Sequence, residues 1–579
     1  MVLITGNSMS SFSTSSIDVD STSSIPPWSR FNQWIHSICI VMFDLELGQV
    51  LEVMYPGDAI LSAQEKANIC YLAFPDSNNA HSRDTKYHFR IRRSQSDVTS
   101  YQQSLILNSP SNLPIHPQFL YGFVHFRQER DLSIPRGFYQ KSVVLLSIIP
   151  FFHLYSTIIE KIALGYFEMG EPAIEAACHD MDQWGPPIAG QSFQLPIMGT
   201  VIQCRLPSAC DIPFTQFDDI RLNVSDGIIK IKSIYEPDIY KNLQSVMKHI
   251  QLVWELVITG EPLLIMASSP TRVASIVQSL VALISPLRYA SDFRPYFTIH
   301  DSEFREYTGR SKHTARVILG VTNPFFVKAL DHWPHILKVS DVSEIDSNDK
   351  QSDKTRKTKH RKHWDGRILD AKDGLFTQYK PFLQRDEGLL KKLSKDGPSE
   401  MHSSVLQRHL LELTQSFMIP LERYLSSLMP LRKEMSPFKS IPSVRPFVIQ
   451  NFLMTLEEAG PSLTCGIKGD WTGLYRRFIV CPSFAEWLSS RSSSMSQQIK
   501  SVYVDSLCDT MIDKEVLAQR HHVEIVDLVL RIRQRVVEME SSSVKRNQLI
   551  SQIRNILNCV DDDLKCVLES NCSLRDILA

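Results

Sequence analysis

The stretch from Leu243 to Ala267, LQSVMKHIQLVWELVITGEPLLIMA, decides the fold of this protein. Its first part repeats apolar residues every three or four positions, which predicts one buried face of a helix. Gly260 tolerates the positive φ that ends a helix, and Pro262 cannot continue one. The apolar run that follows, from Leu263, is too short for a buried helix. We therefore expect a buried strand.

The residues downstream alternate between capped helices and short apolar strands. Ser269 and Pro270 suit the first turn of a second helix, which Ser285 and Pro286 end. Further strands are predicted at Tyr296–Ile299 and Val317–Val321, and further helices after Asp301 or Ser302 and after Asn323 and Pro324. Strands that alternate with helices pair in parallel through right-handed crossovers, so this region predicts an α/β module with a mainly parallel sheet.

Three strings in this region also resemble a known family. They are WELVITGEP at 254–262, SPLRYASDFRPYFTIHDSE at 285–303 and ILGVTNP at 318–324. They resemble the central module of DENN-domain proteins, most closely the DENN domain-containing protein six subfamily. The resemblance extends from about Trp34 to the C-terminal helices. It implies a longin-like lobe upstream, a helical part downstream, and guanine-nucleotide exchange on a Rab GTPase.

The N-terminal region shows the pattern of a small α+β domain. Apolar runs at Ile35–Phe43 and Val50–Met54 predict a hairpin, and Ser62 with Glu65 forms a capping-box string. Strands are expected at 88–92, 121–128 and 141–146, before a helix at 153–162. This order matches the longin-like lobe that the resemblance implies. On the residues alone it is only α+β.

The whole chain divides by composition into six parts. They are a Ser/Thr-rich disordered tail (1–27), the longin-like lobe (28–180), a connecting segment with weak strand signals (181–240), the central α/β module (241–340), a charged disordered insertion (341–365) and a helical region (366–579). In the last part Pro420 is expected to kink or interrupt a helix, and Ile550–Leu568 to form a single one.

Composition excludes several classes of protein. The net charge of −1 gives no overall field for nucleic acid, so we expect no nucleic-acid partner. The eleven cysteines lack zinc-ligand spacing, which favours reduced thiols in the cytoplasm and no metal. No apolar run reaches the 18 residues of a membrane span, and the start does not read as a signal peptide.

No motif for covalent chemistry is present. The sequence has no nucleophile elbow, no dinucleotide or phosphate loop and no zinc-protease motif. We therefore expect no catalytic residues, no cofactor and no enzyme in the bond-making sense. His300, Asp301 and Ser302 could suggest a hydrolase, but neighbouring residues of an extended chain point to opposite sides, so helix capping is the better interpretation.

Ligands of parallel sheets usually bind beyond the carboxyl ends of the strands. The residues there, with the turn of the N-terminal hairpin, form our hypothesis for the Rab-binding surface: Asp292, Phe293, Arg294, His300, Asp301, Glu303, Thr322, Asn323, Asp44 and Gly48. Arg294 has a second interpretation, in which it pairs with Asp292 or Asp301 and only holds its loop. Separately, the basic run from Lys354 to Lys362 can attract an anionic membrane, although a solvated loop fits as well.

The resemblance implies one further set of expectations. For the subfamily it resembles, the target is Rab fourteen on the endocytic recycling route, so we expect a cytoplasmic protein recruited peripherally to recycling endosomes. A Rab effector or trafficking scaffold of the same fold, without exchange activity, is the alternative. An effector would prefer the GTP-loaded Rab and leave nucleotide release unchanged.

Overall fold

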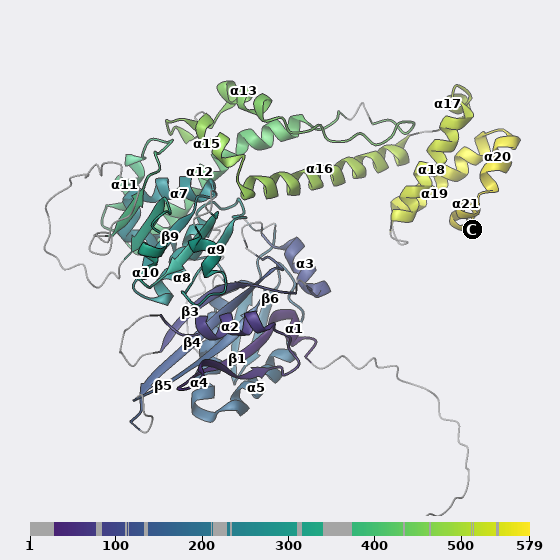
Figure 1. Cartoon of the computed structure of the whole chain (residues 1–579). Helices are drawn as coiled ribbons and strands as arrows, with labels where there is room; N and C mark the ends of the chain where they lie inside the picture. Colours follow the sequence, from purple (N-terminus) through teal and green to yellow (C-terminus); the bar gives the residue numbers. More distant parts are fainter. Residues whose placement is uncertain are drawn as a thin grey trace, which may run out of the picture.

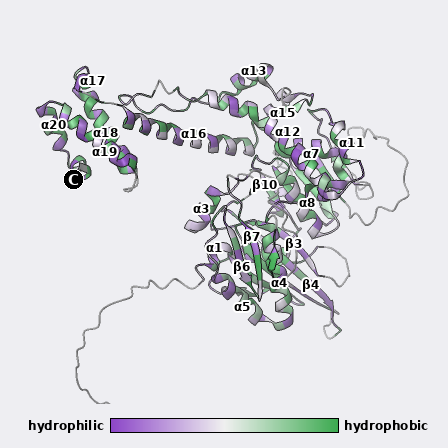
Figure 2. Ribbon diagram, turned by 180° about the vertical axis from the view of Figure 1, so that it is seen from behind, coloured by the Kyte–Doolittle hydropathy of each residue, from purple (hydrophilic) through white to green (hydrophobic). Residues whose placement is uncertain are grey.

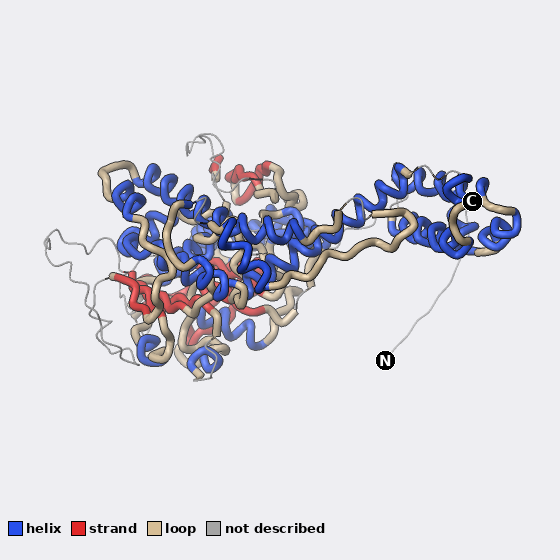
Figure 3. Tube along the Cα trace, turned by 90° about the horizontal axis from the view of Figure 1, so that it is seen from above, coloured by secondary structure: helices blue, strands red, loops and turns tan. Residues whose placement is uncertain are grey.

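A computed structural model gives the fold of the chain. It describes residues 28–76, 84–95, 97–110, 113, 115–132, 137–209, 211, 228–231, 234–309, 315–339, 373–431, 435–461, 465–510, 512, 514–539 and 544–578. The predicted disordered tail and the whole of the charged insertion, including the basic run Lys354 to Lys362, lie outside these residues. Two lobes pack against each other, and a helical module stands at the far end of a long helix (Figures 1 and 3).

The N-terminal lobe is an antiparallel sheet with helices on both faces, which agrees with the α+β domain predicted from its sequence. The strands are β1 (Ser37–Asp44), β2 (Gly48–Tyr55), β3 (Thr85–Arg92), β4 (Phe119–Arg130) and β5 (Phe138–Ser147), in the order β2-β1-β5-β4-β3. Its helices are α1 (Phe31–Trp34), α2 (Ala63–Leu72), α3 (Ser100–Asn108), α4 (Phe152–Met169) and α5 (Glu171–Asp182). Ser62 and Glu65 form the predicted capping box of α2.

Helices α2 and α4 cover opposite faces of this sheet. Phe123 of β4 contacts Tyr155 of α4, with ring centroids 5.2 Å apart. Phe126, an odd number of residues further along, must point to the other face, and there it contacts Phe74 just after α2. The α3 helix, capped by Thr99, was not expected from the sequence.

The connecting segment forms a small sheet of its own. It contains β6 (Ser192–Ile197), β7 (Thr200–Arg205) and β8 (Ile228–Lys230). The single strand expected at 197–204 is instead a hairpin, because Met198 and Gly199 both have positive φ and turn the chain between β6 and β7. The ring of Phe193 lies 5.4 Å from that of Trp34, so this sheet packs on the N-terminal lobe.

The central module is the mainly parallel α/β fold that the sequence predicted. Its strands are β9 (Leu263–Ala267), β10 (Asp292–Arg294), β11 (Val317–Val321), β12 (His335–Val339) and β13 (Gly374–Thr377). In the order β10-β11-β9-β12-β13, the first four are parallel and β13 is antiparallel. The helices are α6 (Ile239–Leu243), a 3₁₀ helix (Gln244–His249), α7 (Ile250–Ile258), α8 (Pro270–Ala282), α9 (Phe304–Thr308) and α10 (Phe325–Ala329).

The continuous apolar run of β9 follows from burial on both faces of the sheet. Leu263 and Ile265 belong to the large core shared with α7 and α8, whereas Leu264 and Met266 belong to a second core that contains Phe326 of α10. The prediction of a strand at 296–299 was wrong. The strand is β10, which begins four residues earlier and has a charged residue at each end.

The rest of the described chain is helical. Its helices are α11 (Glu387–Leu393), α12 (Ser399–Ser427), α13 (Ile449–Ala459), α15 (Trp471–Phe478), α16 (Pro482–Asp509), α17 (Lys514–Ala518), α18 (His522–Glu538), α19 (Val544–Cys559), α20 (Asp562–Glu569) and α21 (Cys572–Leu578). Pro420 lies inside α12 without interrupting it. The helix expected at 550–568 is two, α19 and α20, because the chain turns extended at Asp561.

Helices α17 to α21 form a separate unit, which we call the C-terminal module. Its own hydrophobic core contains Leu528, Ile532 and Ile553, together with Leu507 from the end of α16. The module is joined to the two lobes by α16 and by the segment around Phe438, which packs on the same core (Figure 1). Hydrophobic and hydrophilic residues alternate along its helices (Figure 2), as expected of amphipathic helices.

We predict that Gly320→Ala destabilises the central module. A Cβ at Gly320 would clash with the carbonyl oxygen of Pro295 and lie 3.0 Å from methyl groups of Val273 and Val277. Overpacking of this kind costs about 1–3 kcal/mol. Thermal unfolding should show a lower midpoint for this variant. Gly57→Ala, which meets open space, is the control, and equal midpoints for the two variants would contradict the prediction.

Candidate functional site

The two lobes meet where an edge strand of each sheet approaches the other. Strand β3 of the N-terminal lobe contacts both β10 and α8 of the central module. Arg294 donates from Nη1 to the carbonyl oxygen of Arg90 (3.1 Å), and Arg90 donates from Nη1 to the carbonyl oxygen of Phe293 (3.2 Å). We call this contact the seam. Each arginine therefore binds the backbone of the other lobe.

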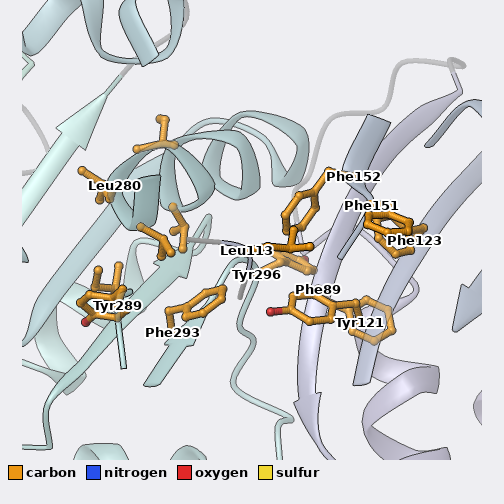
Figure 4. Packing of buried hydrophobic residues seen from close by; sticks show 14 of the residues in the cluster. Phe89, Leu113, Tyr121, Phe123, Phe151, Phe152, Leu280, Tyr289, Phe293 and Tyr296 are labelled. Carbon is orange, nitrogen blue, oxygen red and sulfur yellow. The ribbon is translucent and has the colours of Figure 1, made fainter. Parts of the chain in front are cut away.

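Aromatic rings surround Arg90 within the seam. Its guanidinium carbon lies 3.4 Å from the ring centroid of Phe119 and 4.0 Å from that of Phe293, one ring from each lobe. Figure 4 shows the ring of Phe293 pointing from the central module toward the N-terminal lobe, where Phe89 and Tyr121 lie. A guanidinium buried between ring faces is attracted by both rings, so Arg90 holds the two lobes together.

Carboxylates of the central module neutralise these arginines. Asp292 accepts hydrogen bonds from Arg90 (3.0 Å) and Arg294 (3.1 Å), and Glu303 pairs closely with Arg294. Tyr307 donates a hydrogen bond to Asp292 or Glu303, each 3.1 Å away. Burial opposes ionisation of Asp292, yet the three nearby arginines still hold its pKa below the ordinary value.

The seam shows where several residues of the predicted Rab-binding surface lie in the fold. Arg294 is 1% exposed, and Phe293, Asp301 and Glu303 are buried as well. Arg294 forms an ion pair with Asp292, as the second interpretation of this residue expected. Arg294 is therefore not available on the surface of this structure. Contact of these residues with a Rab stays a prediction.

The predicted helix-capping residues lie against α2. The ring of His300 stacks on that of Tyr71, with centroids 4.8 Å apart. Ser302 accepts hydrogen bonds from Gln64 and Asn68 on the same helix. Asp301 accepts from the backbone N–H of Glu303 and so stabilises the turn that leads into α9. The carboxyl edge of the central sheet is thus largely covered by the N-terminal lobe.

Asn323 and Thr322 fix the end of β11 in the same way. Asn323 donates to a carboxylate oxygen of Asp76 (3.1 Å), and Thr322 donates to the carbonyl oxygen of the same residue (3.1 Å). The side-chain oxygen of Asn323 accepts from the N–H of Phe325 and starts α10, as predicted. Phe325 itself is 50% exposed beside this contact.

The turn between β1 and β2 remains at the surface. Asp44 accepts two backbone hydrogen bonds, from Leu47 (2.9 Å) and Glu46 (2.8 Å), and these lower its pKa. Gly48 has φ +80°, which a side chain would strain. Leu45 and Leu47 are 57% and 77% exposed. The turn therefore presents two leucines that the fold does not bury.

Two residues of the seam were missed by the sequence reasoning. Arg90 and Arg92 alternate with apolar residues in β3, so both point to one face of the strand. Arg92 pairs with Asp292, Glu303 and Glu306. Two arginines on one face of a strand whose other face carries Tyr87, Phe89 and Ile91 are a signal for carboxylate partners elsewhere in the chain.

The described residues contain neither a group of three or more potential metal ligands nor a helix long and apolar enough to cross a bilayer. The described cysteines are all free thiols.

Comparison with known proteins identifies the family. The chain is 45% identical to Protein DENND6A of Gallus gallus over 557 residues, which cover 94% of each protein. The chain belongs to the DENND6 family. It is also 42% identical to Protein DENND6B of Homo sapiens over 94% of each chain, and 31% identical to the Protein DENND6 homolog of Dictyostelium discoideum over 88% of this chain.

Two family models match parts of this DENND6 chain. The model described as "Stabilization of polarity axis" matches residues 237–345, which contain all the parallel strands of the central module. The model described as the DENND6 C-terminal domain matches residues 512–571, most of the C-terminal module. The predicted resemblance to DENN domain-containing protein six is therefore confirmed.

We predict that Arg294→Met weakens the seam. The change leaves Asp292 and Glu303 buried without their main cation, and breaking a buried ion pair from one side costs about 3–5 kcal/mol. Urea unfolding should show a lower midpoint. The control is Arg408→Met, because Arg408 is 81% exposed and pairs only with Glu412 on its own helix. A midpoint as high as that of the control would show that the seam does not depend on Arg294.

We predict that the free energy of unfolding depends on pH through Asp301. Burial raises its pKa to about 6, so the folded state binds this proton more tightly than the unfolded chain. The resulting stability is complete below about pH 4 and is lost as the pH rises through about 6. Since one pKa unit is about 1.4 kcal/mol, the whole effect is at most about 3 kcal/mol.

The variant Asp301→Asn tests this dependence. Asparagine keeps the oxygen that accepts from Glu303 but cannot ionise, so the variant should gain stability relative to the unchanged protein between pH 4 and pH 7. Thermal unfolding of both proteins across this range measures the difference. Parallel stability profiles would mean that Asp301 is already ionised at low pH.

Proposed function

We propose that this protein is a guanine-nucleotide exchange factor for a Rab GTPase. The observation that carries the proposal is its membership of the DENND6 family, over nearly the full length and with both lobes present. By the resemblance of its central strings, we propose Rab fourteen as the target. We also propose that the protein is cytoplasmic and is recruited peripherally to recycling endosomes.

Exchange needs binding energy and no reacting side chain. A factor that binds the nucleotide-free GTPase more tightly than the loaded one must, by linkage, weaken nucleotide binding by the same factor. A 1000-fold weakening corresponds to about 4 kcal/mol. The natural target is a switch segment of the GTPase, which is ordered by nucleotide and magnesium. We therefore propose an exchange factor that does no covalent chemistry.

We propose for the Rab a surface that we call the rim, which consists of the β1–β2 turn and the start of α10. The β1–β2 turn exposes Leu47, and the start of α10 exposes Phe325. These two sites are connected through packed residues. Phe43 at the end of β1 contacts Phe74, with ring centroids 6.4 Å apart, and Asp76 binds Asn323 next to α10. Exposed apolar anchors on a rigid frame suit recognition of a partner.

In this proposal the seam acts as a positioning element. Arg90 and Arg294 fix the angle between the lobes, and this angle sets the distance between Leu47 and Phe325. Seam variants should therefore lower exchange by misplacing the anchors, without touching the Rab.

We predict that the purified protein accelerates GDP release from one or a few Rabs, with Rab fourteen among them. Release of a fluorescent GDP analogue across a Rab panel measures the rate. Leu47→Ser and Phe325→Ser should each lower the stimulated rate about tenfold, which corresponds to about 1.4 kcal/mol of lost binding. Leu164→Ser is the matched control, because Leu164 is 42% exposed on α4, away from the rim.

Two outcomes would contradict the proposal. If the protein accelerates release from no Rab but binds the GTP-loaded form preferentially, it is an effector or scaffold. If it stimulates release and the two rim variants retain the full rate, the function stands and the proposed surface is wrong.

A further inference from the structure

Helix α18 has a second apolar face that the C-terminal module does not use. Its inner face, which includes Leu528, Ile532 and Val536, is buried in the core of the module. On the outer face Val523 is 76% exposed, Leu530 is 37% exposed and Val537 is 64% exposed. These three lie seven residues apart, so they form one line along the helix.

Two polar residues complete this outer ridge. Asp527 and Gln534 are also exposed, and the ridge reads Val523, Asp527, Leu530, Gln534, Val537, with alternating spacings of four and three. That spacing is typical of the residues through which two helices pack side by side. In one chain Asp527 lies 3.9 Å from Arg531, and Gln534 donates a single N–H to Glu538, so its second amide N–H is not used in that bond.

The ridge is complementary to a second copy of itself that runs antiparallel. About Leu530 it has valine at both ends and a polar residue between, so a two-fold axis at Leu530 sets Val523 against the partner's Val537. The same axis places Asp527 beside the partner's Gln534, whose free amide N–H can donate to the carboxylate. A two-fold contact in which residue i meets j and j meets i is the requirement for a closed dimer.

The opposite orientation is disfavoured by charge. In a parallel pair each ridge residue meets its own counterpart, so Asp527 would lie against the partner's Asp527. Two carboxylates at one helix contact repel each other. The three acidic residues of α18 balance its three arginines, and the charged residue on the ridge itself is the acidic Asp527, so the ridge has no positive charge with which to attract an anionic membrane. A second copy of this chain, packed antiparallel, is the occupant that the ridge fits.

We propose that the protein forms a homodimer through antiparallel packing of α18 against α18, centred on Leu530. The contact is one pair of helices of 17 residues each, which is smaller than standard stable interfaces. The dimer is therefore weak and reversible, with a dissociation constant in about the micromolar range. It brings two copies of the Rab-directed lobes into one particle, although the proposal does not depend on exchange activity.

Sedimentation equilibrium of the full-length chain over a range of concentrations tests the dimer. The unchanged protein should show a dimer fraction that rises with concentration, and Leu530→Glu should remove it. Val567→Glu is the matched control, because Val567 is 63% exposed on α20 in the same module but lies outside the ridge. Gln534→Arg should tighten the dimer several-fold, since arginine would pair with the partner's Asp527. A misfolded variant cannot give that result.

Cysteine crosslinking tests the orientation. In a background in which the exposed Cys566 and Cys572 are replaced by serine, Leu530→Cys should form a disulfide-linked dimer on oxidation. Val523→Cys alone should not, whereas Val523→Cys combined with Val537→Cys in one chain should. Efficient linkage by Val523→Cys alone would show a parallel pair and overturn the proposal. A protein that stays monomeric at about 100 μM, well above the predicted constant, or an effect of Val567→Glu equal to that of Leu530→Glu, would also overturn it.

Discussion

The relative position of the two lobes depends on two arginines, each of which reaches across the contact and binds the backbone of the other lobe. Arg90 binds the carbonyl of Phe293, and Arg294 binds the carbonyl of Arg90, so each lobe supplies a cation to the other's backbone. Burying two guanidinium groups is costly unless every charge is matched. Asp292 and Glu303 provide that match, and the rings of Phe119 and Phe293 pack against the guanidinium of Arg90. A longer hydrophobic contact would permit sliding, whereas directional bonds define one arrangement.

This constraint also determines which residues occupy the carboxyl edge of the central sheet. In open α/β sheets that edge is the usual place for ligands. Here Asn323 is occupied by Asp76, and Ser302 by Gln64 and Asn68. At β10 and β11 this edge is therefore a joint between the two lobes.

Local patterns predicted much of this fold, and long-range pairing accounts for what they missed. The capping box at Ser62 and the buried strand β9 are set by neighbouring residues, so the sequence is sufficient to find them. Strand β10 was missed because Asp292 and Arg294 are charged, and charged residues are unusual in strands. Their partner Arg90 lies about two hundred residues earlier, and only the folded chain brings them together. Pro420 does not interrupt α12, because Phe417, Leu421 and Leu425 on either side of it are packed in the core; whether it kinks the helix stays a prediction.

The strands on either side of the charged insertion have a consequence for how this chain can vary. β12 and β13 are antiparallel neighbours, and Lys338 is paired with Gly374, so the chain leaves and re-enters the sheet at the same place. Closing a loop costs free energy that grows only with the logarithm of its length. Lengthening or shortening the residues between these two anchor points is therefore nearly neutral for the sheet. We therefore expect this position to tolerate insertion of another domain without loss of the sheet.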